Sequence, residues 1–292
     1  MTTTTARNAL MNPAFRLWDY GESLDLAALP AVPYAATRWK VAGGTAAGTI
    51  AKGTTPTGST TDKWVRGVDA LTATITTAGT CSVTQTIENG VRIARGLHTL
   101  SVVAFGPAGG SFTVEAAGVR GVLKTTGGVN PDVLHLDVFT GDIVANDLPV
   151  TIFKDPGAAG TYQVVFVQLL TGIEKPARGP FHIPTITEER ARCARYCVPV
   201  TSGELVHGNA SSAFLAPRFD MRVAPSFIAH TTVFDAIQIR SGSAGQITSA
   251  NISTSNVSTT GARVSVQGTA TGFTATEMMM TTPRLGVFHA DF

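Results

Sequence analysis

Hydrophobic and polar residues alternate with a period of two along most of this chain. The alternation is clear in residues 71–76, 97–105, 112–115, 133–139 and 162–167. Successive side chains of a strand point to opposite faces, so this pattern predicts half-buried β-strands. Gly, Pro and Asn stand between the segments, which is typical of tight turns joining short strands. The sequence therefore predicts an all-β fold built from antiparallel β-sandwich, jelly-roll-like modules.

One short helix interrupts the strands, near residues 188–196. Thr185 and Glu188 fit a capping box, in which each side chain satisfies the backbone N–H of the other residue. Pro199 is expected to stop the helix soon afterwards. Alternation then returns, which predicts a second β-module.

With 292 residues the chain exceeds a typical single domain, so two modules are expected. We predict an N-terminal arm at residues 1–7, a jelly-roll-like module at 8–175, a linker with the short helix at 176–197, and a second β-sandwich at 198–292.

Charge and composition exclude several classes of protein. The 22 basic and 20 acidic residues give a net charge of +2, which predicts no nucleic-acid partner and no polybasic membrane patch. Residues 1–7 lack the pattern of a signal peptide, and no apolar run reaches the length of a membrane span. We expect synthesis in the cytoplasm without membrane insertion.

The three cysteines are too few for a disulfide framework. Cys193 and Cys197 are four residues apart, but neither has His or Cys neighbours at metal-ligand spacing, so packing is the preferred interpretation. No metal or other cofactor is expected.

Catalytic patterns are weak. Asp132, Asp137, Asp142 and Asp147 recur every five residues, and a glycosidase needs two carboxylates across a cleft. Asp is also favoured at turns and strand ends, and we interpret these four residues in that way. No nucleophile elbow or phosphate loop is present, so the sequence predicts a protein that is not an enzyme.

Six segments follow one another in a recognisable order: NALMNPAFRLW at residues 8–18, ATRWKV at 36–41, QTIENGVR at 85–92, GLHTLSV at 96–102, VQLLTG at 167–172 and EERARCARY at 188–196. In this order they resemble the bacteriophage tail-fibre and head-fibre (spike) family of virion proteins with a carbohydrate-binding-module-like jelly roll. The resemblance implies that the module at 8–175 is carbohydrate-binding-like and that the protein is made in the cytoplasm of a bacterial host. The chain departs from the family at Leu170, where a Glu is usual, and at Cys197, where a second Tyr is usual.

The resemblance implies a non-enzymatic fibre or spike on the surface of a phage or a phage-like gene transfer agent. It implies adhesion to host surface polysaccharide, and an opening strand at residues 8–18. Trp18 and Trp39 lie in matched segments and are assigned to the core. The chain has no long docking segment of the family's kind, so we expect a separate base or adaptor protein on a tail or capsid vertex.

Sugar binding needs flat aromatic faces with polar groups beside them. The first module offers such residues in polar, Gly- or Pro-rich surroundings; for Trp64, packing at a sheet edge is the alternative. The glycan-binding candidates are Trp64, Tyr34, Tyr20, Arg66 and Asp62, with Lys63 beside them.

Three classes of function stay open: a glycan-binding fibre, a purely architectural virion protein, and a polysaccharide depolymerase. Fibres gain affinity from several copies, so a homo-oligomer is expected, first a trimer and second a pentamer. Residues 277–280 (EMMM) offer either an interface between copies or a strand buried within the second module. Residues 2–7 are expected to dock as an extended arm onto the base protein.

Overall fold

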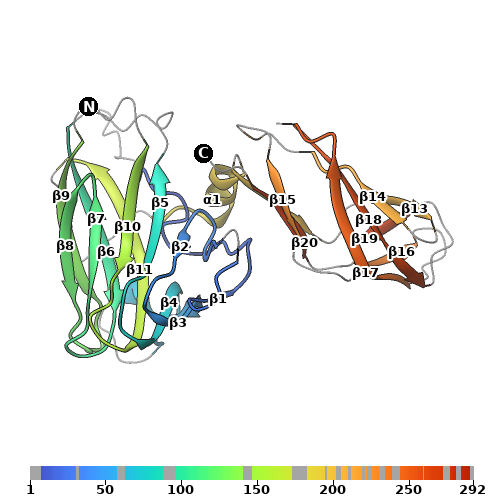
Figure 1. Ribbon diagram of the computed structural model, residues 1–292. Helices are drawn as coiled ribbons and strands as arrows, with labels where there is room; N and C mark the ends of the chain where they lie inside the picture. Colours follow the sequence, from blue (N-terminus) through green and yellow to red (C-terminus); the bar gives the residue numbers. More distant parts are fainter. Residues whose placement is uncertain are drawn as a thin grey trace. The chain divides into compact units, whose positions relative to one another are not determined.

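In a computed structural model the regular structure of the described residues is almost entirely β, with antiparallel sheets and one α-helix among those residues, which confirms the predicted fold class (Figure 1). The chain divides into two compact units, Met1–Glu189 and Arg190–Phe292. The structure describes residues 8–30, 33–57, 63–87, 96–140, 147–172, 183–194, 196–201, 205–209, 212–218, 221, 225–229, 234–238, 244–258, 260–271, 277–280 and 284–289.

The first unit is a sandwich of two antiparallel sheets. The six-stranded sheet has the order β1(Ser23–Asp25), β3(Ala47–Thr54), β4(Asp69–Thr77), β11(Gly160–Thr171), β6(Gly96–Phe105) and β9(Asp132–Thr140). The five-stranded sheet has the order β2(Lys40–Ala42), β5(Ser82–Ile87), β10(Leu148–Lys154), β7(Ser111–Ala116) and β8(Val119–Lys124).

The core lies between these sheets because their alternating apolar residues face one another. Phe112, Phe153 and Tyr162 meet in its centre, with ring centroids 4.9 to 5.9 Å apart. Trp39 is fully buried and Trp18 is nearly so, which confirms their assignment to the core. The strands predicted from alternation correspond to β4, β6, β7, β9 and β11.

The opening strand implied at residues 8–18 is wrong. This segment forms bends and turns, and Asn12 and Phe15 adopt left-handed backbone angles, with φ of 47° and 52°. Left-handed residues cannot continue a strand. The segment nevertheless bonds the part of β11 that extends beyond its pairing with β4: Ala9 N–H donates to Leu169 O (3.1 Å) and Val167 N–H to Pro13 O (3.0 Å).

Helix α1 spans Ile186–Cys193. The predicted capping box is confirmed: Thr185 N–H donates to the Glu188 carboxylate at 2.7 Å, and Glu188 N–H to Thr185 Oγ1 at 3.3 Å. Pro199 does not end the helix, which stops before it. Instead Pro199 lies in an edge strand, where a missing N–H is tolerated.

The second unit has a three-stranded sheet, in the order β12(Cys197–Thr201), β20(Arg284–His289), β15(Ser226–Ala229). Its other strands close into a barrel, an arrangement that alternation alone does not specify. The barrel order is β13(Leu205–Asn209), β14(Ser212–Leu215), β18(Arg263–Thr271), β17(Ala244–Ser255), β16(Phe234–Gln238), β19(Glu277–Met280). Strand β19 pairs with strands on both sides, and Met280 is buried.

Candidate functional site

Five of the six segments that carry the family resemblance meet in one hydrogen-bonded network, centred on Asn8 and Asn12. Asn8 Nδ2 donates to Val167 O at 3.0 Å, and its Oδ1 accepts from Leu169 N–H at 3.0 Å. An asparagine side chain can thus replace a strand partner, because it carries a donor and an acceptor like a peptide group. This contact fixes the N-terminal loop to the part of β11 that extends beyond its pairing with β4.

Asn12 uses its whole side chain inside the loop. Its Oδ1 accepts from the N–H groups of Arg16 (2.9 Å) and Leu17 (3.1 Å), and its Nδ2 donates to Leu17 O (2.9 Å) and Thr37 O (3.2 Å). Asn tolerates the left-handed conformation seen here better than most residues. The side chain is almost fully buried, so these four bonds replace water.

Three further matched segments reach the same loop. Gln85 bonds the backbone of Met11 through both of its amide atoms, at 2.8 and 2.9 Å. Trp39 Nε1 donates to Asn12 O at 3.1 Å, and Asn12 N–H donates to the carboxylate of the buried Glu189. The matched residues are therefore buried and structural, and they give the first unit its N-terminal closure.

The predicted glycan residues lie in two places. Tyr20 and Tyr34 stack on one another, with ring centroids 4.7 Å apart and an interplanar angle of 23°. Tyr34 is only 5% exposed, so Tyr20, which is half-buried, supplies the accessible part of the pair.

Trp64 lies on the outer side of the six-stranded sheet, in the short 3₁₀ helix η1(Lys63–Val65). It is half-buried and packs against clusters that include Val103, Phe105, Val165 and Phe166 from β6 and β11. Packing therefore accounts for much of its surface. Lys63 and Arg66 beside it are exposed, while Asp62 lies outside the described residues.

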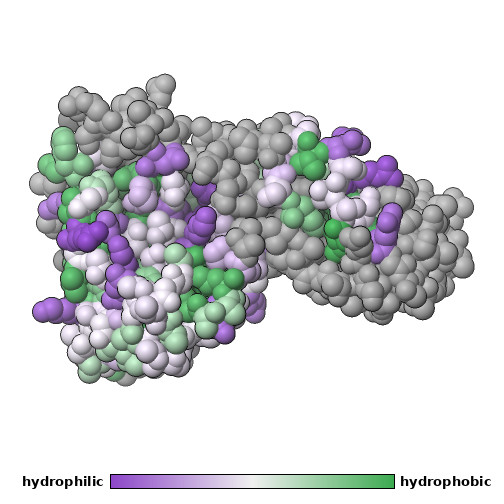
Figure 2. Space-filling view, viewed as in Figure 1, coloured by the Kyte–Doolittle hydropathy of each residue, from purple (hydrophilic) through white to green (hydrophobic). Residues whose placement is uncertain are grey.

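A larger accessible surface is the outer side of the five-stranded sheet. One residue in two along its strands points inward to the core, and the others face solvent, with Figure 2 showing hydrophilic residues over β7 and β8. We call these solvent-facing residues the polar face. They are Lys40, Ala42, Ser82, Thr84, Thr86, Ser111, Thr113, Glu115, Arg120, Val122, Lys124, Pro149, Thr151 and Lys154.

Strand register arranges the polar face in rows. Lys40, Thr84, Thr151, Glu115 and Arg120 are successive cross-strand partners, and together they cross all five strands. At about 4.8 Å between strands the row is about 19 Å long. It crosses rigid strands, so its side chains hold fixed spacings.

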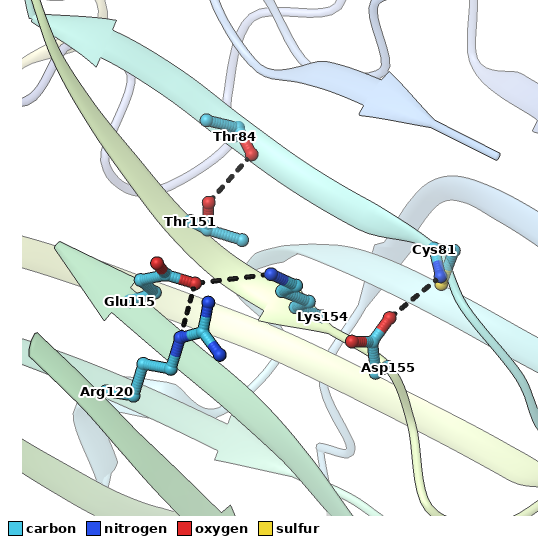
Figure 3. Close-up of polar contacts among 7 residues, drawn as sticks. All are labelled: Cys81, Thr84, Glu115, Arg120, Thr151, Lys154 and Asp155. Atoms are coloured by element: carbon cyan, nitrogen blue, oxygen red, sulfur yellow. Dashed lines mark hydrogen bonds and ion pairs between the residues drawn. The ribbon is translucent and has the colours of Figure 1, made fainter. Parts of the chain in front are cut away.

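Glu115 is the centre of the polar contacts on this face (Figure 3). Its Oε2 lies 3.1 Å from Arg120 Nε and 3.2 Å from Lys154 Nζ, while Thr84 and Thr151 hydroxyls are 2.9 Å apart. Partial burial raises the pKa of Glu115, but the hydrogen bond from Lys154 and the charges of Lys154 and Arg120 outweigh burial and lower its pKa overall. Glu115 therefore stays ionised and neutralises one of the cations.

Cys81, beside this sheet, is not a nucleophile candidate. Burial, followed by the nearby charge of Asp155, raises the pKa of its thiol to about 11. The backbone N–H of Cys81 donates to Asp155 Oδ1 at 3.3 Å (Figure 3). A thiol with this pKa is protonated at neutral pH and reacts slowly.

A serine and a histidine contact one another in the six-stranded sheet, but a substrate cannot reach the serine. Ser101 Oγ lies 2.9 Å from His135 Nδ1, and Ser101 is fully buried.

The predicted aspartates lie in different settings. Asp137 lies within β9 rather than at a turn, which corrects the turn interpretation for this residue; Asp132 begins β9, and Asp142 lies outside the described residues. Across the described ranges, no group of three His, Cys, Asp or Glu side chains could hold a metal ion, and no helix is long and apolar enough to cross a membrane.

Sequence reasoning missed the polar face. Lys40, Glu115 and Lys154 lie far apart in the chain and become neighbours only through the strand order β2-β5-β10-β7-β8, which alternation does not reveal. The available signal was the second face of each strand, where Thr, Ser and Lys alternate with the core residues.

No model of a known protein family matches the chain, and no curated protein matches it. Among solved structures, the chain is similar to TmCBM61 in complex with β-1,4-galactotriose, with 13% identity and a TM-score of 0.35 over 56% of this chain and 99% of that chain. It is also similar to the N-terminal CBM22-1-CBM22-2 tandem domain of Paenibacillus barcinonensis Xyn10C, with 10% identity and a TM-score of 0.33 over 94% of this chain and 98% of that chain. Both are similarities of chain trace at low sequence identity.

Proposed function

We propose that this protein is a surface fibre or spike of a phage or phage-like particle, and that its first unit adheres to host-cell glycan without cleaving it. The observation that carries the adhesion role is the polar face, because it presents hydroxyl and charged groups in fixed rows on rigid strands. Sugar hydroxyls both donate and accept hydrogen bonds, and so do the Thr and Ser side chains of this face.

The virion role is supported by the resemblance of the matched segments to phage fibre proteins. Asn8 and Asn12 of one matched segment meet Trp39, Gln85 and Glu189 of three others in one network. Chance similarity in unconnected segments has no reason to converge in space, so this convergence favours a shared fold of the first unit.

The purified full chain should bind at least one bacterial surface polysaccharide on a glycan array, and antibodies against it should label phage-like particles in electron micrographs. Labelled particles without any glycan binding would leave the architectural role. Binding without labelled particles would remove the virion assignment.

An architectural virion protein is the second candidate, favoured by one observation. Tyr34 is buried and Trp64 packs on its own sheet, so much of the predicted aromatic surface is used within the unit. For a depolymerase, incubation with the bound polysaccharide should release new reducing ends; we expect none.

Assembly and placement complete the proposal. We expect a homo-oligomer, a trimer before a pentamer, mounted by residues 2–7 on a base protein at a tail or capsid vertex. Those residues lie outside the described part of the chain. Light scattering at micromolar concentration should give a multiple of the chain mass, and a monomer would contradict this arrangement. Deleting residues 2–7 should leave the oligomer folded and prevent its incorporation into particles.

A further inference from the structure

The polar face carries an excess of positive charge. Among its residues, Lys40, Arg120, Lys124 and Lys154 are basic and only Glu115 is acidic, so the face has three net positive charges. The entire chain has a net charge of +2. The polar face alone therefore carries more net positive charge than the entire chain, and the rest of the chain has one net negative charge.

Two of these four cations lie beside Glu115, and the other two lie on the outermost strands of the sheet. Arg120 and Lys154 both contact Glu115, which sets their spacing near the middle of the face. Lys40 and Lys124 are exposed on the two outermost strands, β2 and β8. Lys124 pairs with Ser111 and lies four residues along β8 from Arg120, the end of the cross-strand row. A ligand running diagonally from Lys40 to Lys124 would therefore meet a cation at each end and Lys154 between them.

The remaining side chains define what kind of anion fits. Ser82, Thr84, Thr86, Thr113 and Thr151 supply hydroxyls between the cations, and no aromatic ring lies on these five strands' outer side. Hydroxyls bond sugar hydroxyls, whereas Lys and Arg bond carboxylate, sulfate or phosphate groups. Without an aromatic ring, stacking on apolar sugar faces contributes little there.

From these observations we infer that the polar face binds an acidic polysaccharide, with Lys40 on β2 and Lys124 on β8 contacting anionic groups at its two sides. This inference rests on the proposed glycan adhesion and names its ligand class and its surface. The surface does not include Trp64, whereas Tyr34 is the bridge partner of Lys40, so the Tyr20–Tyr34 pair borders the β2 side of the polar face.

The experiment measures binding of the purified full chain to immobilised polygalacturonate, alginate and dextran sulfate. Fully methyl-esterified polygalacturonate and plain dextran serve as neutral counterparts. Binding should occur to at least one acidic polymer, fall steeply between low and physiological salt, and be much weaker on the neutral counterpart. Reversal of one exposed charge, Lys40→Glu or Lys124→Glu, should weaken binding about five-fold, and the double variant should weaken it further.

The matched control is Lys52→Glu, an exposed lysine on β3 of the other sheet, which should bind like the wild type. Arg66→Glu tests the alternative surface beside Trp64. Equal thermal unfolding midpoints for all variants would show that folding is unaffected.

Each other outcome has a defined meaning. Binding only to neutral polymers would overturn the acidic ligand and leave glycan adhesion standing. An absence of binding to every polymer would contradict the acidic ligand and glycan adhesion together. Loss of binding in Lys52→Glu or Arg66→Glu, but not in Lys40→Glu, would place the site elsewhere. Equally tight, equally Lys40-dependent binding of oligothymidylate would identify nucleic acid as the occupant instead.

Discussion

The N-terminal network and the polar face of the first unit use similar side chains for opposite purposes. Around Asn12 the amides and the carboxylate of Glu189 are buried, and each bonds a particular backbone group. On the polar face Glu115 and Arg120 contact each other, yet Arg120 stays 65% exposed. Buried polar groups shape the fold, because leaving one unsatisfied is costly, whereas exposed groups remain available to a ligand.

The same difference limits what the matched sequence segments can reveal about function. The segments that resemble phage fibre proteins lead mainly to the network, and of the polar face they include only Lys40 and Thr86. A family resemblance of this kind therefore supports the fold of the first unit and leaves its ligand to be found from the strand register.

The largest expected effect is at the network. Asn12→Ala removes four hydrogen bonds and places Ala at a left-handed angle, so we expect a loss of about 3 kcal/mol in the free energy of unfolding. Urea denaturation measures it. Asn256→Ala is the control, because Asn256 has a similar φ of 53° but is exposed, and it should cost no more than about 1 kcal/mol. Equal losses for both variants would show that the backbone angle, not the network, matters.

The next effect concerns Trp64. Trp64→Ala removes a half-buried ring from the clusters on β6 and β11, so we expect about 2 kcal/mol of destabilisation. Thermal unfolding measures the change, and the neighbouring exposed Lys63→Ala should leave stability unchanged. A stable Trp64→Ala protein that no longer binds glycan would restore Trp64 as a ligand residue.

A smaller effect is expected at the aromatic pair. Tyr20→Ala removes the stacking on Tyr34, which is worth about 1 kcal/mol, while Tyr20→Phe should retain it. Both variants should bind the acidic polymers like the wild type. Loss of binding in Tyr20→Phe would instead assign the Tyr20 hydroxyl to the ligand site.

The smallest effect is the pH dependence of stability at Glu115. The pKa of Glu115 is lowered by folding, so its ionised form stabilises the protein above the unfolded-state pKa of about 4.3, and this contribution is lost as pH falls through the lower folded-state pKa. Because the ion pairs face solvent, the contribution is below about 1 kcal/mol. Glu115→Gln should therefore be slightly less stable at pH 7 and should converge with the wild type as the pH falls through the folded-state pKa of Glu115. A gap in unfolding free energy that stays constant as the pH is lowered would contradict this explanation.

Local patterns predicted local structure well. Alternation located strands such as β6 and β11, and the Thr185 and Glu188 pair located the start of α1, because both depend on neighbours within a few residues. The loop at residues 8–18 was predicted as a strand. Its form is set by Gln85, Val167 and Glu189, which are distant in sequence and bond its backbone.

The candidate site was harder to predict for the same reason. Aromatic residues in polar surroundings indicated Tyr34 and Trp64, but tertiary packing uses much of their surface. Lys40 and Arg120 become parts of one row only when β2 and β8 take their places in the five-stranded sheet.

The long-range hydrogen bonds of the loop at residues 8–18 have a consequence for synthesis on the ribosome. Asn8 bonds Val167, which is 159 residues later in the chain, and Asn12 bonds Glu189, which is 177 residues later. At about 5 to 20 residues per second, Asn8 and Asn12 remain without these partners for roughly 8 to 35 seconds after their own synthesis. The loop at residues 8–18 therefore closes only when the whole first unit has been made, and a ribosome that pauses before Glu189 would hold a first unit in which this loop is not yet bonded.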